Sequence, residues 1–259
     1  MIKNHENYKE LVIRLAKTDF KLRYHNSVLG YFWAVLRPLL MFAVLNFVFS
    51  HLFNLRGMGN PYYPLELLTG ILMFQFFSEG TTNGMHSLLS KAQLVTKIYV
   101  PRWTVILGST VNSLFIFGMN LIVLAIFFAI YGVLPSLPAV LMYFFFSLLL
   151  YIIIVSFSLL TAPLFVRFRD LSMIWEVLLQ VLMYASPIVY PLAMMPETIQ
   201  KVMLLNPLAF VIHFSKRALI ENYFTNISNI LYLVLGVVVI FAISFLVYKK
   251  AEKRVAEVI

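Results

Sequence analysis

Residues that could carry out chemistry are few in this sequence. Its only aspartates are Asp19 and Asp170, and its five histidines are scattered, without the spacing of metal ligands. The chain contains no GxxxxGK(S/T) phosphate-binding loop, no HExxH zinc motif and no GxSxG serine motif. We therefore expect no catalytic residue, no metal and no cofactor in it. If this protein transports a substrate against its concentration gradient, the energy must come from another polypeptide or from an ion gradient.

One apolar segment carries a row of polar side chains. Between Leu171 and Tyr190 this row falls broadly on one helical face, and it comprises Ser172, Glu176, Gln180, Tyr184, Pro187 and Tyr190. A polar row is costly against lipid, so we expect it to face a cavity or a partner helix. Glu176 is the best candidate for a group that titrates in an ion-gradient-coupled carrier. Glu66 and Glu79 lie near opposite ends of their expected helix, which argues against ion coupling.

A second row, of aromatic residues with one amide, lies in the first apolar segment. It consists of Phe42, Asn46, Phe49 and Phe53. Aromatic faces can stack on the C–H faces of sugars while neighbouring polar groups bind hydroxyls. Aromatic residues make up 16% of the chain, so ordinary packing also explains this row, and both interpretations stay open.

The composition identifies the elements that must position these side chains. With 61% hydrophobic and 12% charged residues and a mean hydropathy of +0.88, the chain cannot hide its apolar surface in a soluble core. We predict an all-α polytopic membrane protein, one domain over residues 1–259. It should have six transmembrane helices, over residues 31–53, 65–82, 103–131, 139–165, 171–190 and 230–248. The absence of cysteine excludes disulfides.

Three further segments have helical patterns but are too polar or too interrupted to cross a membrane. Within residues 1–27 we expect an amphipathic helix that lies flat on the membrane, or a solvated start that only sets topology. Residues 87–99 should form a short cytosolic helix, with Leu88, Leu89, Ala92 and Val95 apolar and with Lys91 and Lys97 outward. Residues 191–229 should hold two short external helices broken at Asn206–Pro207. The spacing of Gly80 and Gly84 is that of a close-packing pair.

The basic residues predict the topology. Sixteen Lys and Arg fall on the side that includes both termini and four on the other, so both termini should be cytoplasmic. The net charge of +9 is explained by these flanks, because the basic residues sit between apolar segments, and we expect no nucleic-acid partner.

Four stretches carry a family resemblance that covers nearly the whole chain. They are KLRYHNSVLGYFWAVLRPLL (21–40), KAQLVTKIYVPR (91–102), RFRDL (167–171) followed by LLQVLMYASPIVYP (178–191), and LNPLAF (205–210) with Arg217 downstream. The chain resembles the membrane subunit of ABC-2 type transporters. Within that group it resembles the permeases that export O-antigen and related polysaccharides.

The resemblance implies a homodimer with two copies of a separate ATPase subunit, which would hold ATP and Mg. Residues 87–99 would be the coupling helix, docking on the ATPase through Leu88, Leu89, Lys91, Ala92, Val95 and Lys97. Residues 191–229 would be external gate helices between the fifth and sixth crossings.

The implied substrate is a polysaccharide on undecaprenyl pyrophosphate, moved from the cytosol to the periplasm across the bacterial inner membrane. Its path would run between protomers along the first and fifth crossings, past Phe42, Asn46, Phe49, Phe53, Glu176, Gln180, Tyr184 and Tyr190. Arg23, Arg37, Arg167 and Arg169 would meet the pyrophosphate, or else only anchor the topology. Export of teichoic acid or capsular polysaccharide, an ion-gradient-coupled carrier and a lipid-modifying enzyme are the alternatives.

Overall fold

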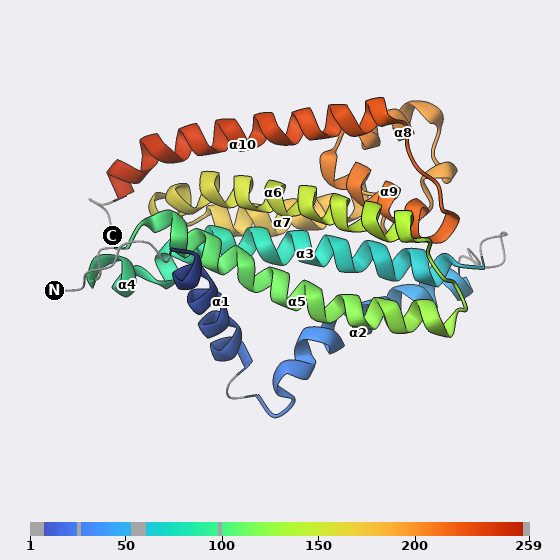
Figure 1. The fold of residues 1–259 in the computed structure, drawn as a ribbon, viewed down its shortest axis with the longest axis horizontal. Coiled ribbons are helices and arrows are strands. Elements are labelled where there is room, and N and C mark those ends of the chain that lie inside the picture. The colour runs from blue at the N-terminus through green and yellow to red at the C-terminus, as the bar shows by residue number, and fades with distance from the viewer. Residues whose placement is uncertain (1–7, 25–26, 53–60, 98–99, 256–259) are drawn as a thin grey trace.

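The computed structural model describes residues 8–24, 27–52, 61–97 and 100–255, and in these residues the regular structure is helical, without a strand (Figure 1). The helices are α1 (Tyr8–Tyr24), α2 (Trp33–Phe47), α3 (Tyr63–Ser90), α4 (Ala92–Lys97), α5 (Arg102–Ile130), α6 (Leu137–Arg167), α7 (Leu171–Ala185), α8 (Glu197–Leu204), α9 (Pro207–Glu221) and α10 (Ile227–Val255). A 3₁₀ turn at Gly30–Phe32 leads into α2, and a π turn at Val48–Leu52 follows it. The predicted all-α class is confirmed for this part of the chain.

The long helices form one bundle. In Figure 1, α3, α5, α6 and α10 run lengthwise beside one another, with α1 and α4 at one end and α8 and α9 at the other. Four described segments are long and apolar enough to cross a membrane: Gly30–Ser50, Arg102–Ile130, Leu137–Arg167 and Ile227–Glu252. The pair α8–α9, bent by 107°, adds a fifth candidate if it counts as one broken span. The chain is thus a multi-pass membrane protein.

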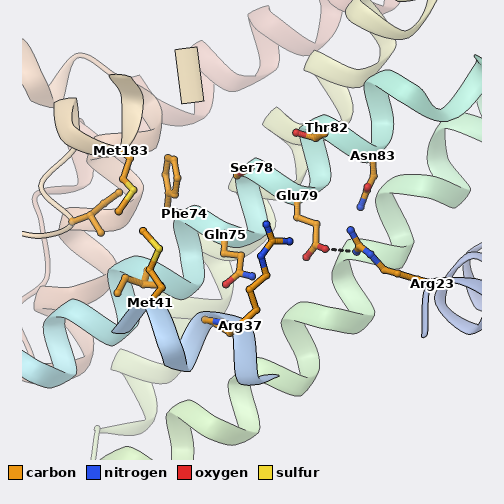
Figure 2. A pocket seen from close by; sticks show the side chains of 13 residues that line it. Arg23, Arg37, Met41, Phe74, Gln75, Ser78, Glu79, Thr82, Asn83 and Met183 are labelled. Atoms are coloured by element: carbon orange, nitrogen blue, oxygen red, sulfur yellow. Dashed lines mark hydrogen bonds and ion pairs between the residues drawn. The ribbon is translucent and has the colours of Figure 1, made fainter. Parts of the chain in front are cut away.

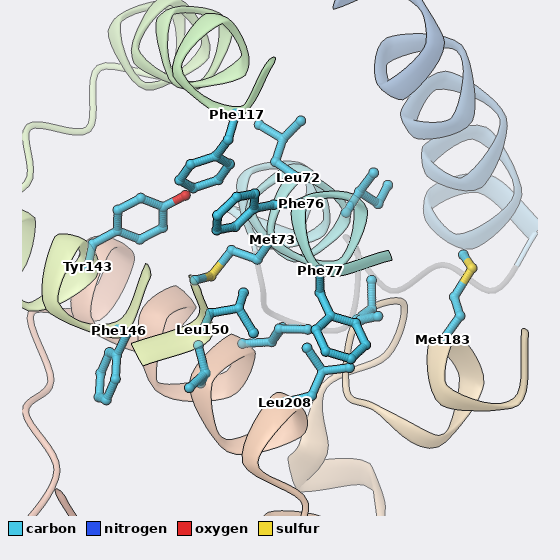
Figure 3. Packing of buried hydrophobic residues seen from close by; sticks show 14 of the residues in the cluster. Leu72, Met73, Phe76, Phe77, Phe117, Tyr143, Phe146, Leu150, Met183 and Leu208 are labelled. Atoms are coloured by element: carbon cyan, nitrogen blue, oxygen red, sulfur yellow. The ribbon is translucent and has the colours of Figure 1, made fainter. Parts of the chain in front are cut away.

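The α3 helix is largely buried within the bundle, and it is too polar to count among those spans. It packs against both α5 and α6 and carries much of the buried core. Figure 3 shows Phe76 of α3 beside Phe117 of α5, with ring centroids 4.4 Å apart, and Tyr143 of α6 close by. Because protein rather than lipid surrounds α3, polar residues on it cost less than they would on a lipid-facing helix.

The predicted close packing at Gly80 and Gly84 is confirmed. A Cβ on Gly80 would lie 2.7 Å from the Ile154 side chain of α6, and one on Gly84 would overlap the Ser158 side chain. Real Cβ contacts are not this short, so α3 and α6 can approach to this distance only because both residues lack side chains.

Two predicted boundaries were wrong. First, α3 continues to Ser90, so residues 87–90 end a long helix, and only Ala92–Lys97 forms a separate one. The side chains of Met85, Ser87 and Leu88 are buried inside the bundle, and this packing favours continuation of α3 over the start of a separate helix. Second, α7 stops at Ala185, because Pro187 follows and Ser186 is extended. The first crossing, expected over residues 31–53, is found as a helical span over Gly30–Ser50, in which Trp33–Phe47 is regular α-helix.

The other predicted elements agree well. Both α5 and α6 begin and end within about two residues of the expected spans, and α10 extends past its span at both ends. The break at Asn206–Pro207 is confirmed, because the Asn206 side chain accepts a hydrogen bond from the backbone N–H of Leu208 and caps α9. The α1 helix packs across α5, with Leu15 against Gly108.

Candidate functional site

A polar pocket lies where the end of α1 and the first half of α2 meet the middle of α3 (Figure 2). It has a volume of about 270 Å³, and Met183 and Ile188 close it on the α7 side. One face of α3 lines it with polar side chains that recur every three or four residues, namely Gln75, Ser78, Glu79, Thr82 and Asn83.

The pocket is organised around a carboxylate that faces two guanidinium groups. Arg23 donates a hydrogen bond to the Glu79 carboxylate and forms an ion pair with it. Arg37 of α2 lines the same pocket, and its positive charge acts on that carboxylate (Figure 2). Two cations and one anion leave a net positive charge among the lining residues. Guanidinium groups bind phosphate in a bidentate fork, so the pocket can hold a phosphate group.

Local structure explains why the two arginines point here. Arg23 lies in the last turn of α1, where a positive charge is favourable at the helix C-terminus. Arg37 precedes Pro38, which is buried inside α2 and cannot donate to the carbonyl of Ala34. Ala34 and Trp33 line an adjoining cavity of about 220 Å³ that also contains both arginines.

The row predicted on the fifth crossing is exposed on the outer face of α7. Glu176, Gln180 and Tyr184 all face away from the chain's own bundle, and Tyr184 is 63% exposed. The opposite face of α7 packs inward through Trp175, whose indole N–H donates to Thr81 at 3.2 Å. The polar row is therefore available to a second molecule or to a cavity outside this chain.

The residues at the two ends of that row, Ser172 and Tyr190, make polar contacts within the chain. The Tyr190 hydroxyl donates to the backbone carbonyl of Tyr184 at 2.7 Å. The Ser172 hydroxyl lies 3.2 Å from Nε2 of His86 on α3.

The aromatic row on α2 is not a continuous surface. Phe42 is buried and makes an edge-to-face contact with Phe127 of α5, with centroids 5.3 Å apart, so packing is the interpretation that fits it. Asn46 is half-buried and accepts a hydrogen bond from Ser50 at 2.9 Å. Phe49 is half-buried against the core, and Phe53 lies outside the described residues. The ring of Phe42 turns toward α5, and a role of this residue on a substrate path stays a prediction.

The four arginines predicted to act together lie in different places. Arg23 and Arg37 share the pocket, whereas Arg167 lines a separate cleft between α6 and α10. Arg169 is exposed in the turn between α6 and α7. The chain reverses direction after Arg167, and this carries the last two away from α2.

The residues predicted to dock on a partner are partly internal. Leu88 is fully buried and Leu89 half-buried, because both belong to the end of α3. Lys91 is not outward: it forms an ion pair with Asp19 of α1 at 2.5 Å and donates to Ser109 at 3.0 Å. Ala92 begins α4, and the side chains of Val95 and Lys97 lie outside the described residues.

A second polar cluster forms hydrogen bonds to the non-helical segment that follows α7. The Lys216 ammonium, buried on α9, donates to the carbonyls of Pro187 at 2.5 Å and Ile188 at 3.2 Å. The Tyr63 hydroxyl donates to the carbonyl of Val189 at 2.7 Å. Gly70 of α3 lets Ile188 approach, since a Cβ there would lie 3.3 Å from the Ile188 side chain. These contacts join α3 and α9 through the chain between them.

Sequence reasoning did not assign Glu79, Lys91, Asp19 or Lys216 to these contacts. The spacing of Gln75, Glu79 and their polar neighbours on one helical face was the available signal for the pocket. The expected helix ended at residue 82, which placed Glu79 near its terminus. The structure corrects this: eleven residues, or about 16 Å, separate Glu79 from Ser90. In the described residues no group of three or more His, Cys, Asp or Glu is placed to hold a metal.

A family model described as "ABC-2 type transporter" matches residues 10–224. Among characterised proteins, the chain is 28% identical over 250 residues to the O-antigen export system permease protein RfbA of Klebsiella pneumoniae, covering 96% of this chain and 95% of that protein. It is 29% identical over 207 residues to RfbA of Myxococcus xanthus, covering 78% and 76% of the two chains. It is 24% identical over 252 residues to the polysialic acid transport protein KpsM of Escherichia coli, covering 96% of each.

Proposed function

The chain belongs to the ABC-2 type transporter family, and from this premise we propose that it is the membrane-spanning permease subunit of an ATP-driven polysaccharide exporter. The observation that carries the proposal is the near full-length similarity to O-antigen export permeases. The absence of a phosphate-binding loop in the sequence supports a separate ATPase subunit as the source of energy.

The proposed assembly is a homodimer with two ATPase subunits in the bacterial inner membrane. Six crossings would be made by α2, α3, α5, α6, α7 and α10, with both termini in the cytosol and with α8 and α9 outside. The sixteen-to-four distribution of basic residues supports this orientation. The exposed polar face of α7 supports a dimer, because in lipid that face would be costly without a partner or a channel.

The substrate in this proposal is a polysaccharide attached to undecaprenyl pyrophosphate. Its diphosphate would bind Arg23 and Arg37, which line the pocket around Glu79. The sugar chain would then pass over Gln180 and Tyr184, where an aromatic face and an amide suit sugar rings and hydroxyls.

Force from the ATPase would enter through α4 and the end of α3. Because α3 is one helix of 28 residues, about 42 Å long, displacement at Ser90 moves the whole rod. The Lys91–Asp19 ion pair would carry α1 along, and therefore Arg23 with it. At the far end, Gly70 and Tyr63 transmit the displacement to the segment held by Lys216.

Export of a capsular polysaccharide is the second candidate, and the similarity to the polysialic acid transport protein KpsM supports it. Identity to the O-antigen permeases is higher over the same share of the chain, 28% against 24%, and favours the first. The pocket argues against an ion-coupled carrier, because its one carboxylate, Glu79, is engaged by Arg23.

Reconstitution tests the proposal. The purified chain alone should hydrolyse no ATP, and co-reconstitution with its cognate ATPase should produce ATP-dependent movement of undecaprenyl-pyrophosphate-linked polysaccharide into proteoliposomes. ATP turnover by the chain alone, or transport driven by a proton or sodium gradient without the ATPase, would refute it. Supplying capsular polysaccharide on its own lipid distinguishes the two candidate substrates.

A further inference from the structure

A basic cleft lies between the ends of α6 and α10, beside the start of α5. It has a volume of about 1280 Å³, and four cationic side chains and one acidic residue line it: Arg102, Arg167, Lys249, Lys250 and Glu252. It shares no residue with the pocket around Glu79. The excess of positive charge predicts an anionic ligand.

Arg102 is held in a conformation suited to such a ligand. Its Nη1 donates to the backbone carbonyl of Glu252 at 2.5 Å, which fixes the guanidinium against the end of α10. Its Nε is buried and has no hydrogen-bond partner within the described residues. A buried N–H without a partner is unfavourable, and the oxygen of a bound anion beside it would remove that penalty.

The rest of the cleft is lined by exposed apolar residues. Leu160, Leu164 and Val247 line it and are each between a third and a half exposed. They continue into the exposed apolar faces of α6 and α10. The Lys249 ammonium lies 4.7 Å from the ring centre of Phe245, so its alkyl stem runs along apolar surface while its charge stays at the cleft. A ligand with an anionic head and hydrocarbon chains complements this combination.

We propose that this cleft binds the phosphate headgroup of an anionic phospholipid of the cytosolic leaflet, with its acyl chains lying along α6 and α10. The occupant is a bulk membrane lipid, because no residue of α7 lines the cleft and its apolar lining residues Leu160, Leu164 and Val247 are exposed. Basic pockets between transmembrane helices on the cytoplasmic side are a general mode of lipid recognition. The site anchors the start of α5 and the end of α10 to the membrane surface.

The test uses the full-length chain purified in detergent and native mass spectrometry with phosphatidylglycerol or phosphatidylcholine added. The cleft variant replaces Arg167, Lys249 and Lys250 with Gln and leaves Arg102 intact. A matched control replaces three exposed basic residues of α1, Lys9, Lys17 and Lys21, with Gln. Gel filtration checks that both variants remain folded.

The parent chain should retain phosphatidylglycerol in preference to phosphatidylcholine. At roughly fivefold for each of the three basic residues removed, the cleft variant should bind it on the order of 100-fold more weakly. The control should change less than about threefold on the same scale. Equal losses in both variants, or none in either, would overturn the proposal.

Two further experiments distinguish the phospholipid from other possible ligands of the cleft. If undecaprenyl pyrophosphate displaces phosphatidylglycerol from the parent chain but not from the cleft variant, the cleft belongs to the transport path and the lipid assignment is wrong. If the cleft variant keeps its lipid but no longer associates with the ATPase subunit, the cleft is a protein-docking surface and the assignment is likewise wrong.

Discussion

Replacing the two members of the Arg23–Glu79 pair should change substrate binding in opposite directions. If Arg23 receives the diphosphate of the lipid carrier, Glu79 competes with that anion for the guanidinium. Glu79→Gln keeps the shape of the side chain and removes the competing charge, so the diphosphate should bind more tightly. Arg23→Gln removes a phosphate ligand and should weaken binding.

The magnitude follows from the geometry of the pocket. A phosphate on the far side of the Arg23 guanidinium would lie about 7 Å from the Glu79 carboxylate, and two unit charges at that distance repel by about 2 kcal/mol at an effective dielectric of 20. The Arg23 side chain is 33% exposed and that of Glu79 is 14% exposed, so solvent screens part of this repulsion. We therefore expect a gain of about 1.4 kcal/mol, or tenfold in affinity, for Glu79→Gln. Arg23→Gln should lose at least as much, since a hydrogen bond to a charged group contributes about 1.5–3 kcal/mol.

The assay is a titration of the detergent-purified chain with undecaprenyl pyrophosphate, followed by tryptophan fluorescence. Trp33 lines the cavity next to both arginines and should report occupancy. The exposed Arg14–Glu10 pair on the same helix is the matched control, and Gln at either position should leave the affinity unchanged. If Glu79→Gln and Arg23→Gln both weaken binding, the pair is only structural and the reasoning is refuted.

Three other substitutions test the packing, the external cluster and the path. Gly84→Val should lower stability by about 1–3 kcal/mol by overpacking the contact with α6, while Gly118→Val, at a glycine with open space around it, should change little; equal thermal shifts would contradict this. Lys216→Met leaves two carbonyls without their donor and should cost about 2 kcal/mol, or roughly 4–8 °C in Tm; an unchanged Tm would show that the ammonium is dispensable. Tyr184→Ala should slow export roughly three- to tenfold with assembly intact, whereas Tyr232→Ala, at an exposed tyrosine on α10, should not; equal rates would exclude Tyr184 from the path.

The elements that the sequence predicted well are those whose surroundings are uniform. Lipid-facing helices such as α5, α6 and α10 must be apolar along their length, so hydropathy alone locates them. The break between α8 and α9 was equally predictable, because Asn206 and Pro207 act through local geometry.

Elements enclosed by protein were harder to predict. The end of α3 has the amphipathic pattern of a surface helix, yet Leu88 packs inside the bundle and Lys91 meets Asp19, which lies 72 positions earlier in the chain. An ion pair between segments that are far apart in the chain does not change the hydrophobic periodicity of either segment, so the sequence pattern does not reveal it. For the same reason Arg23 and Arg37 were predicted as anion ligands, but their shared carboxylate, Glu79, was not.

The shortness of α7 has a consequence for how a hydrated polymer crosses the membrane. Its 15 residues rise only about 22 Å, against a hydrocarbon thickness of about 30 Å, and the turn that follows Ala185 has carbonyls that accept hydrogen bonds from Lys216 and Tyr63. Along this wall the low-dielectric barrier is thus roughly a quarter thinner than the bilayer. On the proposed path along α7, each sugar unit would shed its hydration over a correspondingly shorter distance, which would lower the work that each ATP must supply.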